Sequence, residues 1–560
     1  MSEGRPHAWE KSYPPGVRWD APLPLTTVPA LFDAAVAAHG TRPALEYHDR
    51  SLSYEALGAL VNRAAAGFAA LGVAGANVAL YLPNTPLYPV AFFGALKAGA
   101  RIVNLSPLDA EREVAHKLKD SGARVLVTIT LGALPTTAAK LLAQGLLDRL
   151  IVGDDAAWGG AAAAPLPAEG DERILSFDSL TARGARAVPA VPRLSVNDVA
   201  LLQYTGGTTG VPRAAMLTHG NLTAAVASYA AWTTGQNLLR PAAEKVIGVL
   251  PLFHIYALTT ILLRHLSFGS EILLRPRFDV ETTLRDIEVR RATVFPGVPT
   301  MWVAIAAHPG VERRDFSSLR HCSSGGAPLP AQIALRFERL TGRRLGGGWG
   351  MTETSPAGTN LPASGPDKPD SVGVPLPGVH IDVVALDDGH RVLPRGEIGE
   401  LRVKGPNVMQ GYWKRPEETK AAFVDGHFLT GDIGRMDEDG YVYLVDRKKE
   451  MIISGGFNVY PRIVEDAIYE HPDVEEAVVV GVPDEYRGEA AKAFVKLRAG
   501  AAPLTIEALR EFLGDKLGRH ELPAALELRS SLPRSAVGKL SRRALLSGEA
   551  MPEERRIKHG

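Results

Sequence analysis

The stretch LLQYTGGTTGVPRAAMLTHGN, Leu201–Asn221, joins an apolar, strand-like run to a loop rich in glycine and threonine. Glycine lets a backbone approach a ligand closely, and the N–H and hydroxyl groups of such a loop suit phosphate oxygens. The loop departs from the common P-loop, which needs Gly-Lys-Ser/Thr, because the nearest cation is Arg213. A Gly/Thr turn alone is a weak signal, so the remaining sequence decides what the loop holds. Its central residues are Gly206, Gly207, Thr208, Thr209 and Gly210.

The composition excludes several classes of protein. With 560 residues the chain is too long for one hydrophobic core, which predicts at least two domains. Lys+Arg and Asp+Glu both number 62, so the chain lacks the basic field of a nucleic-acid-binding protein. The single cysteine, Cys322, excludes intrachain disulfides and cysteine-based zinc clusters. We expect Cys322 to be a small buried residue.

Two segments of the sequence indicate where in the cell the protein resides. The N-terminal residues MSEGRPHAWEKSYPPGVRWD have no apolar core after a basic region, so we expect no signal peptide. Val246–Leu263 has no formal charge, but it contains Pro251 and His254 and is followed by Arg264. It is therefore expected to be a buried strand, turn and helix rather than a membrane span. These features predict a cytoplasmic protein, with peripheral membrane contact left open.

Helical and strand patterns alternate along the first part of the chain. Ser53 can cap a helix that Gly72 ends, and NVALYLP, residues 77–83, then predicts a buried strand. The same order recurs around Gly122. Such alternation is typical of α/β sheets with parallel strands. From about Gly396 the pattern becomes β-rich, and the tail indicates a small α+β domain.

Six further motifs accompany the loop. They are LPLFHIYAL (250–258), SSGGAPL (323–329), GWGMTET (348–354), FLTGDIG (428–434), DRKKEMIISGGFNVYP (446–461) and LPRSAVGKL (532–540). Together with YTGGTTGVPRAAMLTH they resemble, in the same order, the motifs of the adenylate-forming superfamily. That superfamily includes acyl-CoA synthetases, amino-acid adenylation domains and luciferases. The residues within these motifs are most similar to those of bacterial fatty-acid–CoA ligases.

The resemblance implies a fold and a reaction. It implies an α/β protein with a large N-terminal domain, residues 1–446, that combines parallel-rich sheets with a β-rich subdomain. A small mobile α+β domain, residues 447–560, would follow. A carboxylate would attack the α-phosphorus of ATP, and the thiol of coenzyme A would then displace AMP. Positioning, Mg²⁺ and fixed donors can lower such a barrier without a covalent nucleophile.

The resemblance also assigns the ATP site. Thr205 and the loop 206–210 would surround the triphosphate, with Arg213 as the nearby cation. Gly206 stands where many members have Ser, and Arg213-Ala214 replaces a common Lys-Gly, although arginine keeps a charge that can bridge phosphate oxygens. Glu353 and Thr208 would hold Mg²⁺, and Thr352 would lie near the α-phosphate. Asp432 and Arg447 would bind the ribose hydroxyls. The adenine and pocket residues would be Gly325, Gly326, Ala327, Gly348, Trp349 and Gly350, although a tryptophan here is commonly core.

The remaining roles concern the acid's carboxylate, the thiol of coenzyme A and a rotation of the small domain. His254 resembles a gate near the carboxylate, although a lone histidine on an apolar segment is more often a core residue. Lys539 resembles the lysine that reaches the carboxylate and α-phosphate, and Lys449 resembles the hinge. Gly455, Gly456 and Phe457 would border the coenzyme A tunnel after the small domain rotates. Acylation of Lys539 by a lysine acyltransferase, reversed by a deacylase, would switch the enzyme off.

The sequence leaves the acid open. Apolar segments around residues 254–266 and 298–305 favour a medium- or long-chain fatty acid, and an aryl acid is an alternative. Arg264 and His265 interrupt the first segment. If either faced the pocket, it could bind a second carboxylate and select a pimelate-like dicarboxylic acid. We expect instead that this helix end extends its charge to solvent. A carrier-protein-loading enzyme and a luciferase-like oxygenase remain rival classes, and homodimerisation is undetermined.

Overall fold

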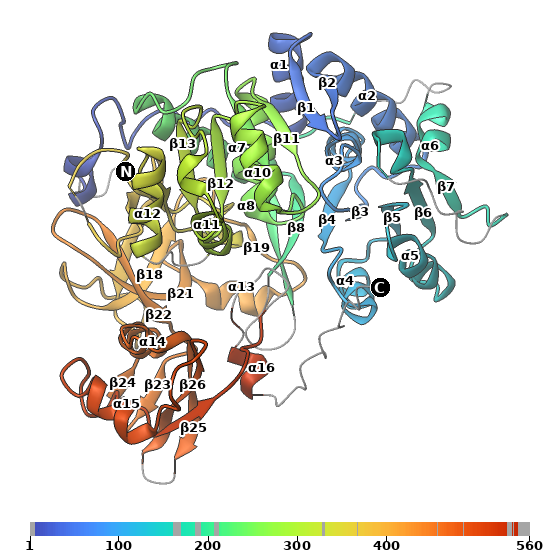
Figure 1. Cartoon of the computed structure of the whole chain (residues 1–560). Coiled ribbons are helices and arrows are strands. Elements are labelled where there is room, and N and C mark those ends of the chain that lie inside the picture. The colour runs from blue at the N-terminus through green and yellow to red at the C-terminus, as the bar shows by residue number, and fades with distance from the viewer. Residues whose placement is uncertain are drawn as a thin grey trace. The chain divides into compact units, whose positions relative to one another are not determined.

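The computed structural model describes residues 6–160, 170–184, 192–205, 212–326, 331–366, 368–455, 457–484, 487–534, 540 and 542–546. The chain forms two compact units (Figure 1). Unit 1 comprises Met1–Asp382, Arg402–Leu429 and Met436–Val442. Unit 2 comprises Val383–Leu401, Thr430–Arg435 and Tyr443–Gly560.

An eight-stranded sheet of unit 1 has the order β19-β9-β8-β4-β3-β5-β6-β7. Strands β3 to β8 pair in parallel, whereas β8, β9 and β19 pair antiparallel. This confirms the predicted parallel-rich α/β architecture. The strands are β3 (Asn77–Tyr81), β4 (Arg101–Leu105), β5 (Val125–Ile129), β6 (Arg149–Gly153), β7 (Ile174–Ser176), β8 (Val199–Thr205), β9 (Arg213–Thr218) and β19 (Gly411–Tyr412).

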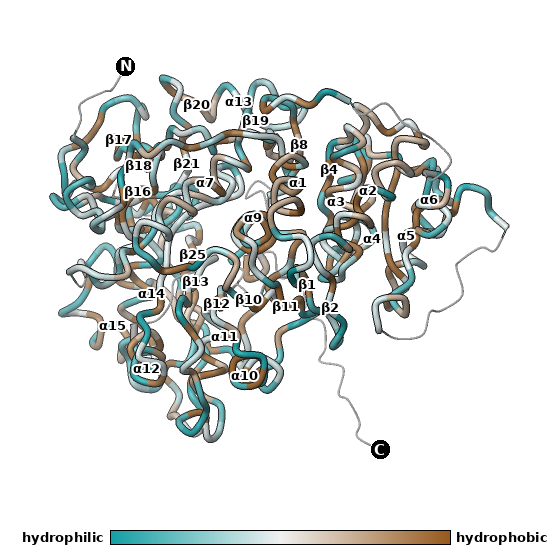
Figure 2. The backbone as a smooth tube through the Cα atoms, turned by 90° about the horizontal axis from the view of Figure 1, so that it is seen from above, coloured by the Kyte–Doolittle hydropathy of each residue, from teal (hydrophilic) through white to brown (hydrophobic). Residues whose placement is uncertain are grey.

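A seven-stranded sheet has the order β14-β13-β12-β10-β11-β1-β2, parallel except for the β1–β2 hairpin. Two of its inner strands, β10 and β11, are themselves largely hydrophobic (Figure 2). The strands are β1 (Pro43–Tyr47), β2 (Arg50–Ser53), β10 (Lys245–Gly248), β11 (Glu271–Leu274), β12 (Val294–Gly297), β13 (His321–Ser324) and β14 (Leu345–Gly347).

Local signals place the helices as the sequence predicts. Ser53 caps α2 by accepting from the Ala56 N–H at 3.1 Å, and Gly122 ends α4 in a left-handed conformation. The larger helices of unit 1 are α1 (Val28–His39), α2 (Tyr54–Ala70), α3 (Leu87–Lys97), α4 (Glu111–Ser121), α5 (Leu134–Ala143), α6 (Phe177–Gly184), α7 (His219–Gly235), α10 (Val280–Glu288), α11 (Pro299–Ala306), α12 (Ala331–Thr341) and α13 (Pro416–Ala422).

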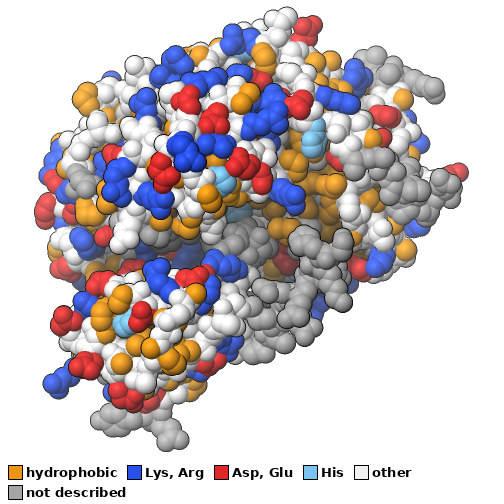
Figure 3. Space-filling view, in the orientation of Figure 1, with side chains coloured by type: hydrophobic (Ala, Val, Ile, Leu, Met, Phe, Trp, Pro, Cys, Tyr) orange, Lys and Arg blue, Asp and Glu red, His pale blue; other side chains and the backbone are white. Residues whose placement is uncertain are grey.

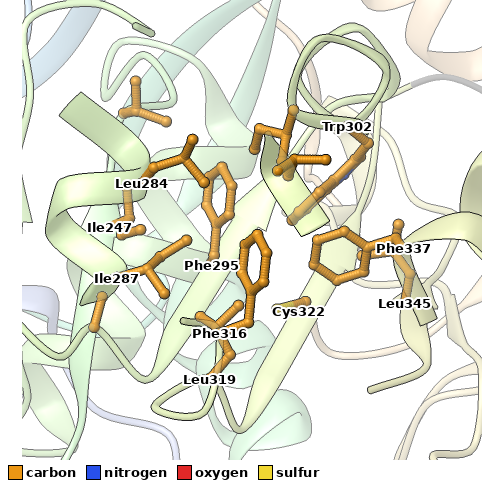
Figure 4. Packing of buried hydrophobic residues seen from close by; sticks show 14 of the residues in the cluster. Ile247, Leu284, Ile287, Phe295, Trp302, Phe316, Leu319, Cys322, Phe337 and Leu345 are labelled. Carbon is orange, nitrogen blue, oxygen red and sulfur yellow. The ribbon is translucent and has the colours of Figure 1, made fainter. Parts of the chain in front are cut away.

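A buried apolar cluster joins the seven-stranded sheet to α10, α11 and α12 (Figure 4). Phe295, Trp302 and Phe337 stack edge-on or tilted at centroid distances of 4.6 and 4.8 Å. Cys322 lies within this cluster, and burial raises the pKa of its thiol to about 12. The expectation that Cys322 is a small buried residue is therefore confirmed.

The segment after β10 is buried as predicted, but its end differs from the expectation. It contains α8 (Ile255–Ala257), a π-helical turn η3 (Leu258–Leu263) and α9 (Arg264–Ser267). Arg264 is 6% exposed and His265 is 1% exposed. The prediction that this helix end extends its charge to solvent is wrong, because α9 packs against α1, α7 and β11, which keep both side chains inside.

Unit 2 contains the α+β domain that the tail predicted. Its sheet has the order β24-β23-β26-β25, with β27 beside β26. Val464, Val479 and Leu509 belong to its core. The elements are β23 (Ile452–Ser454), β24 (Phe457–Val459), α14 (Pro461–Tyr469), β25 (Val474–Asp484), β26 (Gly488–Leu497), α15 (Ile506–Leu513), β27 (Ala525–Leu528) and α16 (Arg542–Leu546).

A further sheet forms largely from the β-rich part of the sequence. Its order is β17-β18-β21-β20, and β22 pairs with β21. Its strands are β17 (His380–Val384), β18 (Gly399–Lys404), β20 (Phe423–Val424), β21 (His427–Met436) and β22 (Val442–Arg447). Two-residue strands β15 (Thr359–Asn360) and β16 (Val374–Pro375) form a separate pair.

The surface charges agree with the equal numbers of basic and acidic residues in the sequence. Basic and acidic side chains are interspersed over the face shown in Figure 3. Within the described part of the chain, no helix combines the length and the apolarity that crossing a membrane requires.

Candidate active site

The Gly/Thr loop connects two adjacent strands of unit 1. Thr205 ends β8 and Arg213 begins β9, and the two residues are partners in the antiparallel register. The Thr205 hydroxyl donates to the Arg213 carbonyl at 3.4 Å. The loop residues Gly206, Gly207, Thr208, Thr209 and Gly210 lie outside the described residues. The β8–β9 hairpin therefore fixes both ends of the predicted phosphate loop.

Arg213 reaches Glu353 through Tyr412. The Arg213 guanidinium lies 4.1 Å from the Tyr412 ring centroid, and its Nη2 donates to the Tyr412 hydroxyl at 3.3 Å. That hydroxyl donates to Glu353 Oε1 at 2.9 Å. The Arg213 side chain also forms an ion pair with Glu418 at 3.1 Å. Two motifs that are about 140 positions apart along the chain thus meet at one tyrosine.

The site is partly desolvated. Glu353 is 5% exposed and Tyr412 is 3% exposed. Burial, and secondarily the Glu353 charge, raises the pKa of Tyr412, so its hydroxyl remains a donor at neutral pH. Arg213 Nε is buried and has no hydrogen-bond partner among the described residues. A buried, unsatisfied guanidinium N–H suits an additional anion such as phosphate.

Tyr412 was not among the predicted site residues. Its position depends on β19, a two-residue strand that pairs with β9 through Gly411↔Met216 and Tyr412↔Ala215. So short a strand has no detectable period in the sequence. In the sequence, Tyr412 stands in the triplet GYW, and nothing separates this triplet from the rest of the β-rich stretch as a site residue.

The backbone around Glu353 has little freedom. A Cβ on Gly350 would lie 1.5 Å from the Pro356 carbonyl oxygen, and one on Gly348 would lie 2.3 Å from the Thr359 oxygen. Thr352–Thr354 form a short 3-10 turn, and the Met409 N–H donates to the Glu353 carbonyl at 2.8 Å. Trp349 is 7% exposed and packs against Gly358, which agrees with a core role.

His254 and the predicted adenine strip lie near a shared tyrosine. His254 Nδ1 accepts from the Tyr256 N–H at 3.2 Å, so the neutral ring carries its proton on Nε2. The Tyr256 ring leaves no room for a side chain at Gly325, where a Cβ would lie 2.7 Å from it. Gly326 has φ +79°, which favours glycine. Ala327 lies outside the described residues.

Unit 2 contains the other predicted ligand residues. Arg447 Nε lies 2.5 Å from Asp432 Oδ1, so the two predicted ribose contacts pair with each other. Asp432 is 6% exposed at its side chain, whereas Arg447 is 43% exposed. Lys449 is exposed in the turn after β22. Gly455 has φ +59° and Phe457 is 59% exposed. Gly456 and Lys539 lie outside the described residues.

The chain is similar to known proteins over most of its length. The family described as AMP-binding enzyme matches residues 32–413, and its C-terminal domain family matches residues 463–539. A long-chain-fatty-acid–CoA ligase of Bacillus subtilis is 38% identical over 554 residues, covering 97% of this chain and 98% of that protein. A feruloyl-CoA synthase of an Amycolatopsis species is 38% identical over 512 residues, covering 90% and 95%. The crystal structure of ATP-bound MatB from Rhodopseudomonas palustris aligns with a TM-score of 0.82 and 29% identity, covering 93% and 99%.

Proposed function

Because this chain belongs to the family of AMP-binding enzymes, we propose that it ligates an aliphatic carboxylic acid to coenzyme A through an acyl-adenylate. ATP would be cleaved to AMP and pyrophosphate. The contact that carries this proposal is the Arg213–Tyr412–Glu353 connection, which joins the phosphate loop to the carboxylate of GWGMTET. The names of the full-length relatives, which are CoA ligases, support the second half-reaction.

The residues of unit 1 would act by placing charge. Arg213 would face phosphate oxygens through its unsatisfied Nε, and Tyr412 would hold both Arg213 and Glu353 in position. Glu353 fits a Mg²⁺ ligand, because a hard cation prefers carboxylate oxygens. Bound there, Mg²⁺ would supply charge neutralisation at the triphosphate.

The other sequence-based roles are proposed with it. Asp432, held by Arg447, would accept hydrogen bonds from the ribose hydroxyls, and His254 Nε2–H would face the acid's carboxylate. Lys539 would approach the α-phosphate in the first half-reaction. Gly455, Gly456 and Phe457 would border the pantetheine path in the second.

The test is an assay of products against a panel of acids. Purified protein is incubated with ATP-Mg²⁺ and octanoate, palmitate, benzoate or an amino acid, with and without coenzyme A. The proposal predicts AMP and pyrophosphate that depend on the acid, and a CoA thioester of one aliphatic class. ADP as the product, or AMP formation that ignores every acid, would contradict it.

A further inference from the structure

Arg264 is a buried cation without an acidic counterpart. It is 6% exposed, and its Nη2 donates to the neutral Thr233 hydroxyl at 3.0 Å. Its Nε is buried and has no hydrogen-bond partner among the described residues. Among the described ion pairs, none joins Arg264 to a carboxylate. The contrast is Arg275, also largely buried, which pairs with Glu46 and Asp286 at 2.6 and 2.7 Å.

Such an arrangement destabilises a protein that has no ligand. Burying a charged group without a partner costs several kcal/mol even after relaxation, and arginine cannot escape the cost by losing its proton at neutral pH. Desolvation lowers the pKa of Arg264 only to about 10, so the guanidinium remains charged. A buried, uncompensated charge that persists in a folded protein calls for a functional explanation.

The surroundings of Arg264 are polar but uncharged. Its guanidinium lies 5.6 Å from the Tyr229 ring centroid, and Tyr256 is a second aromatic neighbour. His265 bonds Ser270 at 3.1 Å, and His321 lies on β13. Burial, reinforced by the Arg264 charge, lowers the pKa of both histidines, to about 3 for His321, so both are neutral. The group therefore keeps a net positive charge from Arg264 alone.

This group adjoins the proposed acyl-adenylate site. Tyr256 follows His254 by two residues, and its ring packs on Gly325 of the predicted adenine strip. Tyr256, His321 and Ser323 are half-buried, whereas Arg264 itself is almost fully buried. Arg264 lies ten residues beyond His254, which is at most about 15 Å along a helix. The π-helical turn η3 directly precedes it, and such turns occur frequently at functional sites.

We propose that Arg264 binds a second carboxylate at the far end of the acid, so that the substrate is a medium-length dicarboxylic acid. The proposal rests on the proposed function, since it names the acid that this ligase would activate. An apolar chain would lie along η3, with one carboxylate near His254 and the other on the guanidinium. Arginine suits this role because its planar fork matches a carboxylate.

The test compares acids that differ only at the distal end. Rates of acid-dependent AMP and CoA-thioester formation are measured for octanoate and suberate, and for adipate, sebacate and dodecanedioate. The wild-type protein should prefer the best diacid over the matched monoacid at least tenfold in kcat/KM. In Arg264→Met this diacid-to-monoacid ratio should fall at least about 30-fold, as expected for losing one partner of a buried charged pair. Arg264→Lys should retain part of the preference.

Ser267→Ala is the matched control. It removes a hydroxyl on the same helix that donates to the Arg264 carbonyl and not to the guanidinium, and it should leave the ratio unchanged. Ligand-induced shifts in Tm provide a readout that needs no turnover: suberate should raise the Tm of the wild-type protein but not of Arg264→Met. Without ligand, Arg264→Met should melt at or above the wild-type Tm, because it removes an uncompensated charge.

The outcomes separate the two proposals. Turnover of octanoate and suberate with equal efficiency, unaffected by Arg264→Met, would overturn the dicarboxylate assignment and leave the ligase in place. Absence of acid-dependent AMP with every acid would refute the ligase. In that case, a suberate shift in Tm that Arg264→Met abolishes would still support the anion site, and no shift would refute it.

Discussion

At the scale of single residues, Tyr412 links the two charges of the proposed ATP site. Its hydroxyl accepts from Arg213 and donates to Glu353, so one group orients a cation and a carboxylate that would otherwise attract each other directly. In the proposed function, Arg213 would act on phosphate and Glu353 on a metal ion. This division of roles depends on one oxygen atom.

Tyr412→Phe should therefore reduce activity more than stability. Hydrogen bonds to charged groups contribute about 1.5–3 kcal/mol, which corresponds to roughly a 10- to 150-fold loss in acid-dependent pyrophosphate release. The measurement is kcat/KM for ATP. Tyr13→Phe, which removes a hydroxyl bonded to the Pro375 carbonyl in the same unit, is the control and should retain activity. Equal activity of Tyr412→Phe and wild type would refute the linking role.

His219 makes stability depend on pH. It is 2% exposed, and its Nδ1 accepts from the Val28 N–H at 3.1 Å. Burial lowers the pKa of His219 to about 4, below the value of about 6.5 in an unfolded chain. The unfolded state then binds more protons between these values, so stability falls as pH decreases from 6.5 to 4.

The size of this effect is measurable. A difference of about 2.5 pKa units corresponds to about 3 kcal/mol of stability lost across that range. His219→Gln retains an acceptor for Val28 and should show a flatter dependence in urea unfolding at pH 7, 6 and 5. Parallel curves for the two proteins would show that His219 does not titrate as described.

At the scale of elements, glycines fix the turn that carries Glu353. Gly350→Ala would place a Cβ 1.5 Å from a carbonyl oxygen, so the backbone between Trp349 and Pro356 must move. We expect this change to lower the free energy of unfolding by about 1–3 kcal/mol and to abolish AMP formation. Gly347→Ala is the matched control, because its Cβ would make ordinary contacts at 3.6 Å. Comparable losses in both variants, by thermal melting and by activity, would contradict this explanation.

Elements also show where sequence reasoning succeeds. The cap at Ser53, the left-handed Gly122 and the buried strand Asn77–Tyr81 depend on neighbouring residues, and all were predictable. The position of Tyr412 depends on strand pairing between distant segments, which no local pattern encodes. The Asp432–Arg447 ion pair depends on the pairing of the neighbouring strands β21 and β22. Arg264 was misplaced because a cation at a helix end normally faces solvent, and only the tertiary path of the chain buries it.

At the scale of the whole molecule, the proposal assigns different half-reactions to different parts of the chain. Lys539 lies outside the described residues, so its role rests on the LPRSAVGKL motif. Lys539→Ala should abolish acyl-adenylate formation yet leave thioester formation from supplied acyl-adenylate largely intact. Lys516→Ala, which removes an exposed lysine paired with Glu470, is the control. Equal loss of both half-reactions in Lys539→Ala would contradict the assignment.

The central claim is that the acid's carboxylate attacks the α-phosphorus of ATP. The most direct measurement is the fate of oxygen when the protein acts on an acid labelled with ¹⁸O in its carboxylate, in the presence of ATP-Mg²⁺ and coenzyme A. The account predicts one ¹⁸O atom in the phosphate of AMP, because the bridging oxygen leaves with AMP when the thiol attacks. Unlabelled AMP, or ADP as the nucleotide product, would contradict an acyl-adenylate route.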